Sequence, residues 1–189
     1  NPYRDVRSTA WYYEDVAYVT RNDLMVGTDT MTFSPDGEMS RAMLVAVLYR
    51  MSGSPSVAGM TAPFTDVPEG AWYQKAVTWA YSVGIVNGVT ATTFSPNANI
   101  TRQDFVLMLM RYLNNVRMVD RTWKPDDLSR FVDAGSVGFW ALDAMKDAVA
   151  INAISGVTVD GRLYIQPARN ATRAEAAKIL MVFHKTMNK

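Results

Sequence analysis

The sequence contains no cysteine and only one histidine, His184, among its 189 residues. Without cysteine the chain can form no disulfide, no thiolate metal site and no cysteine nucleophile. A single histidine leaves too few ligands for a histidine-rich metal site and too little for a histidine-based triad. We therefore predict no metal, no cofactor and no catalytic residue.

An excess of one charge and a long hydrophobic run are also missing. Nineteen Lys and Arg residues face eighteen Asp and Glu residues, so the formal net charge is +1, which argues against a nucleic-acid-binding protein. The longest apolar run, Ala42 to Tyr49, has eight residues, whereas a membrane span needs roughly 20. With 49% apolar residues the chain can still bury a core. There is no initiator Met and no signal-peptide pattern, so we expect a mature chain or an excised fragment.

One motif recurs three times along the chain. The first two copies align without a gap: six residues separate Asp5 from Trp11 and also Asp66 from Trp72. The third copy starts at Phe131, with one extra residue before its Trp and three extra residues after its Gly. Self-similarity of this kind predicts a repeat protein whose units fold together. The predicted repeats are 1–51, 64–113 and 131–187, and the predicted linkers are 52–63 and 114–130.

Each repeat reads as helix, loop, helix. The first helix is amphipathic, and in the three copies it is followed by residues that tolerate a left-handed backbone: Asp23, Gly84 and Asn152. The second helix begins after a strong N-cap residue in each copy: Ser40, Thr101 and Thr172. The second helices are apolar on nearly every side, so they belong inside a bundle. We predict an all-α fold with three repeats in a pseudo-threefold arrangement around a central three-helix bundle.

The repeated residues resemble the S-layer homology (SLH) repeat. The second copy carries its pattern most completely, at Phe64, Asp66, Val67, Trp72, Gly84, Gly88, Phe94, Pro96, Thr101, Arg102 and Asp104. The first copy carries it at Tyr3, Asp5, Trp11, Gly27, Phe33, Pro35, Ser40 and Arg41. The third copy carries it at Phe131, Asp133, Trp140, Gly156, Pro167, Thr172, Arg173 and Glu175. In a departure from the family pattern, Met43 stands where an acidic residue follows the Arg.

This resemblance implies a module that anchors bacterial surface proteins or exoenzymes, outside the cell, by non-covalent binding to secondary cell-wall polysaccharide. It also implies an anionic ligand, typically pyruvylated N-acetylmannosamine, held in grooves between repeats. The partner would then be this glycan, and the module would be fused to a surface or exoenzyme cargo.

Three classes of repeated side chain suit such a sugar acid. The arginines follow the helix N-caps, where open backbone N–H groups and the helix dipole favour an anion, and a guanidinium pairs with a carboxylate: Arg41, Arg102 and Arg173. The tryptophans offer a surface for the apolar face of a sugar: Trp11, Trp72 and Trp140. The aspartates accept from hydroxyl or amide donors: Asp5, Asp66 and Asp133.

Structural alternatives remain open for two of these classes. The tryptophans would also serve as core residues at the start of the outer helix. Each aspartate would also serve to cap the following helix or to pair with the arginine of its repeat. If the arginines bind the glycan, we expect Arg102→Ala to weaken binding more than Arg41→Ala, because the second copy keeps the motif most completely.

Two other functions compete with wall anchoring. One is a protein–protein assembly module of the S-layer that associates through exposed aromatic residues. The other is a cell-wall glycan hydrolase that uses a pair of carboxylates. The acidic positions recur once per repeat, whereas catalysis normally needs one asymmetric set of groups, so the hydrolase is the weaker alternative.

Overall fold

The computed structural model describes residues 1–188, which are mostly helical. The α-helices are α1 (Tyr13–Arg21), α2 (Arg41–Met51), α3 (Gln74–Ser82), α4 (Arg102–Tyr112), α5 (Leu142–Ala150) and α6 (Arg173–Met187). A π-helical turn, η1 (Leu113–Arg117), continues α4, and the 3₁₀ turns η2 (Ala134–Ser136) and η3 (Phe139–Ala141) precede α5. Among the helices described, none has the length and apolar character that a membrane span needs.

A small antiparallel hairpin corrects the all-α prediction. Strands β1 (Val157–Val159) and β2 (Arg162–Tyr164) pair with Val157 opposite Tyr164. The hairpin lies in the loop of the third copy that has three extra residues. Asp160 and Gly161, which join the strands, both have a positive φ, as the tight turns of two-residue hairpins require. The extra length is therefore used to extend a loop, and the helical part of the prediction is retained.

The predicted starts of the second helices and the predicted ends of the first helices are confirmed. The side chains of Ser40, Thr101 and Thr172 each accept a hydrogen bond from the backbone N–H three residues on. Thr172 and Glu175 form the reciprocal contacts of a capping box. The first helix of each repeat, α1, α3 or α5, is followed by a residue with the predicted left-handed backbone. These residues are Asp23, Gly84 and Asn152, with φ of 54°, 74° and 61°.

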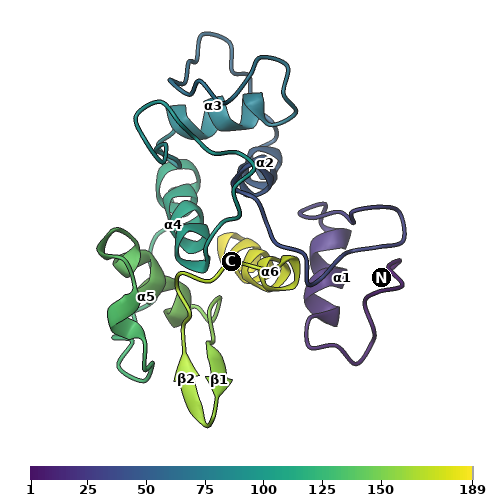
Figure 1. The fold of residues 1–189 in the computed structure, drawn as a ribbon, viewed down its shortest axis with the longest axis vertical. Coiled ribbons are helices and arrows are strands. Elements are labelled where there is room, and N and C mark those ends of the chain that lie inside the picture. Colours follow the sequence, from purple (N-terminus) through teal and green to yellow (C-terminus); the bar gives the residue numbers. More distant parts are fainter. Residues whose placement is uncertain (189) are drawn as a thin grey trace.

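Three helices form the centre of the molecule, and the other three lie outside them. Figure 1 shows α2, α4 and α6 around the centre of the view, with α1, α3 and α5 farther out. Each outer helix packs on the inner helix of a different repeat: α1 on α6, α3 on α2 and α5 on α4. The apolar face of each outer helix is thus buried by a neighbouring repeat, so the repeats interlock.

A closed cycle of backbone hydrogen bonds joins the segments that lead into the inner helices. The N–H of Met39 donates to Ala171 O at 3.0 Å, Ala171 N–H to Ile100 O at 2.9 Å, and Ile100 N–H back to Met39 O at 2.8 Å. All three residues are buried, so each bond replaces one that water would otherwise make. Closing this cycle requires all three segments at once.

The second predicted linker is partly structured. It begins inside η1, and its Trp123 packs against the core while its indole N–H donates to Asp147 Oδ1 at 3.0 Å. Arg121 of the same segment pairs with Asp147 at 2.9 Å. Trp123 thus packs back onto the body, where Asp147 of α5 provides an acceptor for its indole N–H.

The interlocked packing predicts one cooperative unfolding transition. Val16 of α1 and Val77 of α3 are both fully buried, each against an inner helix of another repeat. Val16→Ala and Val77→Ala should each lower the free energy of unfolding by about 2 kcal/mol. Denaturant titration followed by circular dichroism and by tryptophan fluorescence should show one shared midpoint. Separate transitions in either variant would contradict a single folding unit.

Candidate functional site

The three repeated tryptophans are exposed, so the alternative that they are core residues is wrong. Trp11, Trp72 and Trp140 keep 63%, 65% and 51% of their surface exposed. Trp11 and Trp72 each sit just before an outer helix, and each makes a T-shaped contact with the neighbouring tyrosine. More than half of each indole side chain is therefore open to a ligand.

The repeated arginines reach across the boundaries between repeats and are largely buried. Arg102 and Arg173 are only 4% and 8% exposed, and Arg41 is partly buried. In each case the guanidinium Nε donates to a backbone carbonyl of the next repeat: Arg41 to Phe94 at 2.9 Å, Arg102 to Ile165 at 2.9 Å and Arg173 to Phe33 at 2.7 Å. These bonds fix the stem of each arginine and leave Nη atoms for further contacts.

The expectation that helix N–H groups are open to an anion is wrong. At the start of α4, Arg102 N–H donates to Arg169 O at 2.9 Å and Gln103 N–H to Pro167 O at 3.0 Å. The next N–H, of Asp104, donates to the Thr101 hydroxyl at 3.2 Å. Corresponding bonds occupy the first three N–H groups of α2 and α6. Any anion here must therefore bind to side chains.

Three surface grooves bring these arginines and tryptophans together. Each groove takes its arginine from one copy of the motif, its tryptophan from a second, and the loop and inner helix of the third. The Arg102 groove, of about 390 Å³, contains Trp11, Arg169, Glu175 and Lys178. The Arg173 groove, of about 320 Å³, contains Trp72, Met43 and Arg50. The Arg41 groove, of about 480 Å³, contains Trp140, Asp104 and Arg111.

Glycines allow the loops of the grooves to lie against an aromatic ring. A Cβ on Gly88 would lie 2.7 Å from the Phe64 ring, and one on Gly156 would lie 2.6 Å from the Phe131 ring. Such contacts are shorter than van der Waals packing permits. A Cβ on Gly88 would lie still closer to the carbonyl oxygens of Thr90 and Thr93, at 2.1 and 2.5 Å, and Gly156 has a positive φ of 83°. These glycines therefore reflect the turn of the loop as well as its close approach to the first aromatic residue of the motif.

The repeated aspartates hold the loops that receive the arginines. Asp66 accepts from the backbone N–H of Phe94 at 2.8 Å and of Ser95 at 2.7 Å. Asp5 and Asp133 accept from equivalent pairs of N–H groups, 2.7 to 2.9 Å away. The outer helices have no side-chain cap, and none of these aspartates pairs with an arginine within residues 1–188. The aspartates thus position the carbonyl groups to which the arginine Nε atoms donate.

Several charged groove residues escaped the sequence analysis. Arg50 and Arg111 line two grooves, and each follows the repeated arginine by nine residues, a recurrence that the alignment contains. In the third copy the corresponding cation is Lys178, one turn earlier in its helix, where it contacts Ser155. Arg169 lines the same groove but has no counterpart in the other copies, so the repeat alignment does not identify it as a groove residue.

The carboxylate of Asp66 should stabilise the fold in a pH-dependent way. Burial acts to raise its pKa, but the N–H groups of Phe94 and Ser95 outweigh this and hold the pKa below the usual value of 3.8. A lowered folded-state pKa contributes stability that is present above about pH 4 and is lost as the pH falls through the folded value. Asp66→Asn should therefore cost about 2 kcal/mol at pH 7 and less at pH 3.

Urea unfolding of the variant and of wild type at both pH values tests this prediction. Asp36→Asn, which alters an exposed carboxylate in the loop before α2, serves as the control. Equal losses from the two substitutions would mean that the loop does not depend on Asp66.

The amino-acid sequence is similar to a known domain family and to several known proteins. The sequence model of the S-layer homology domain matches residues 2–42 and 63–106. An endoglucanase of Bacillus sp. (strain KSM-635) is 33% identical over 182 residues, which are 95% of this chain and 18% of the relative. A surface-layer 125 kDa protein of Lysinibacillus sphaericus is 28% identical over 79% of this chain and 13% of the relative.

A third relative is the cellulosome-anchoring protein of Acetivibrio thermocellus, 30% identical over 59% of this chain and 26% of the relative. The chain thus spans less than a fifth of the length of the first two relatives. Each match covers more than half of this chain and a small part of the relative. The chain belongs to the S-layer homology domain family.

Proposed function

We propose that the chain is a triple SLH module with its repeats at 1–51, 64–113 and 131–187, in a pseudo-threefold arrangement. The interlocked helices, the hydrogen-bond cycle and the three matching grooves support this arrangement. The third repeat lies outside the regions matched by the family model. Its Arg173 and Asp133 nevertheless make the same hydrogen bonds to the loop backbone as their counterparts, and its Trp140 lines a groove as Trp11 and Trp72 do.

The module anchors its protein to the bacterial cell wall by binding an anionic secondary cell-wall polysaccharide. The observation that carries this proposal is the composition of the grooves: each joins an exposed tryptophan to a guanidinium held by the neighbouring repeat. Cations outnumber carboxylates in every groove, although the whole chain has a net charge of only +1. Positive charge is therefore concentrated where an aromatic surface is open.

A pyruvylated N-acetylmannosamine unit fits this chemistry. Its ketal carboxylate would bind the Nη atoms of Arg41, Arg102 or Arg173, since a charged pair of this kind is a strong hydrogen bond. Its apolar ring face would lie on the indole of the same groove. Three modest sites on one polymer strengthen each other, because the second contact is effectively intramolecular. For the aspartates, direct contact with the sugar stays a prediction beside their observed structural role.

Wall retention tests the proposal. Purified module should bind isolated cell wall, a pyruvate-ketal saccharide should release it, and enzymatically depyruvylated wall should not retain it. Retention that is indifferent to the ketal would overturn the carboxylate mechanism. Binding to other surface proteins without wall would instead favour the assembly module, and release of reducing sugar from wall would favour the hydrolase.

The hydrogen bonds of Arg102 and Arg41 lead us to predict the opposite ranking of their alanine variants from the one based on motif completeness. Arg102 Nη1 already donates to Glu175 at 2.7 Å, whereas Arg41 donates only through its Nε. Arg41→Ala should therefore weaken binding at its groove about tenfold, and Arg102→Ala about threefold or less.

Isothermal titration of both variants with pyruvylated N-acetylmannosamine measures these losses. Because both arginines also bridge repeats, melting temperatures must first show that each variant is folded. A larger loss in Arg102→Ala would restore the order expected from the sequence.

A further inference from the structure

The three grooves differ at one helical position, the third residue after the N-cap of the inner helix. This residue is Met43 in α2, Asp104 in α4 and Glu175 in α6. Each lines the groove of its own helix, together with the arginine that the neighbouring repeat contributes. The position therefore decides whether that arginine meets a carboxylate of the protein.

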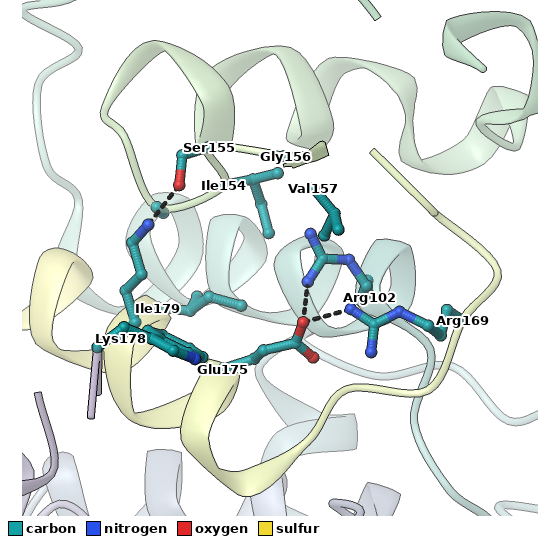
Figure 2. A pocket seen from close by; sticks show the side chains of 11 residues that line it. Arg102, Ile154, Ser155, Gly156, Val157, Arg169, Glu175, Lys178 and Ile179 are labelled. Carbon is teal, nitrogen blue, oxygen red and sulfur yellow. Dashed lines mark hydrogen bonds and ion pairs between the residues drawn. The ribbon is translucent and has the colours of Figure 1, made fainter. Parts of the chain in front are cut away.

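In the Arg102 groove the protein supplies its own counter-ion. Figure 2 shows the Glu175 carboxylate between the guanidinium groups of Arg102 and Arg169, with contacts to both. The Arg102 and Glu175 side chains are only 5% and 14% exposed. Burial acts to raise the pKa of Glu175, but the two arginines and the Thr172 N–H outweigh it and lower the pKa, so the carboxylate stays ionised. A ligand carboxylate must compete with Glu175 for Arg102.

The Arg41 groove is intermediate. Asp104 lines it, but its two oxygens accept from the Trp140 indole N–H at 3.2 Å and the Thr101 hydroxyl at 2.8 Å. Within residues 1–188, Arg41 forms no ion pair. The negative charge of Asp104 nevertheless remains in the groove and opposes a second anion.

The Arg173 groove contains no carboxylate among the residues that the structure describes. Arg173 donates to the carbonyls of Phe33 at 2.7 Å and Val26 at 2.6 Å, and its guanidinium carbon lies 4.7 Å from the centre of the Phe33 ring. These neutral partners hold the guanidinium in place without neutralising its charge. Arg50 adds a second cation, and the facing position is the thioether of Met43.

We propose that the residue at this helical position sets the charge preference of each groove, and that the Arg173 groove is the principal site for a carboxylate-bearing sugar. Within residues 1–188 Arg173 forms no ion pair, and Asp5 acts on it only at longer range, as the equivalent aspartates act on the other two arginines. A buried cation without a paired carboxylate gains most from an incoming anion. The Arg102 groove, with Glu175 in place, discriminates least between an acidic sugar and its neutral analogue. This inference rests on the proposed glycan binding and assigns the acidic unit to one groove.

Met43→Glu tests the proposal in a variant that should fold well. An acidic residue at this position suits a helix N-terminus and would complete a capping box with Ser40. The new carboxylate would face Arg173 as Glu175 faces Arg102, so affinity for the acidic sugar in this groove should fall about tenfold. Met43→Gln, of similar size but uncharged, is the matched control and should change affinity less than twofold.

The binding should be read groove by groove. The indole N–H signals of Trp72, Trp140 and Trp11 report the Arg173, Arg41 and Arg102 grooves in a heteronuclear NMR titration. The ligand is the methyl glycoside of pyruvylated N-acetylmannosamine, and its carboxyl methyl ester is the neutral comparison. In wild type the acid should shift the Trp72 signal at a lower concentration than the other two indole signals. The ester should shift the Trp72 signal only at a higher concentration than the acid does.

The reciprocal variant is Glu175→Gln, whose amide oxygen can still accept from the Thr172 N–H. Its NH2 group replaces the oxygen that accepts from Arg102 and Arg169, so both the charge and the ion pairs are removed. This variant should increase affinity for the acid at Trp11 about three- to tenfold and leave Trp72 unchanged. The proposal is wrong if Met43→Glu and Met43→Gln weaken binding equally, or if Trp11 responds before Trp72 in wild type. If no indole shifts with the acid or with wall fragments, the proposed glycan binding itself fails, which is a different result.

Discussion

The structure depends on the closed cycle of backbone hydrogen bonds that joins Met39, Ala171 and Ile100. The first two N–H groups of each inner helix donate to carbonyls of the neighbouring copy, beside this cycle. The starts of α2, α4 and α6 are thereby joined, and their buried polar groups are satisfied only when all three are present. The outer helices join the same three copies a second time, because α1 packs on α6, α3 on α2 and α5 on α4.

This constraint also builds the grooves. Each repeated arginine follows the helix start that the cycle holds, so its guanidinium crosses into the next copy and donates to a carbonyl there. The loop that offers this carbonyl is held in turn by an aspartate, for example Asp66 on the N–H groups of Phe94 and Ser95. An anion site in such a place comes from guanidinium groups with limited solvation, because the helix N–H groups are already used.

The grooves share a plan but not a charge pattern. Met43, Asp104 and Glu175 occupy one position in the three grooves. In the part of the chain that the structure describes, the arginine opposite Met43 has no ion pair, the one opposite Asp104 has a carboxylate nearby, and the one opposite Glu175 has a direct ion pair. This position takes no part in the hydrogen-bond cycle, so a change there alters the charge of a groove without breaking the cycle. For a module that binds a polymer, several sites of unequal preference suit a chain of unlike sugars.

Local features of the fold followed from the sequence alone. N-caps at Ser40, Thr101 and Thr172 and left-handed stops at Asp23, Gly84 and Asn152 depend on residues within one turn, so short-range chemistry predicts them. The repeat alignment likewise identified the arginines and tryptophans that line the grooves. Only the tertiary structure decided that the outer helices pack on other repeats and that the tryptophans are exposed. It also decided that Arg102 pairs with Glu175, whereas Arg173 forms no ion pair within residues 1–188. The partners of both arginines lie in another repeat and more than seventy residues away along the chain, so short-range patterns do not predict them.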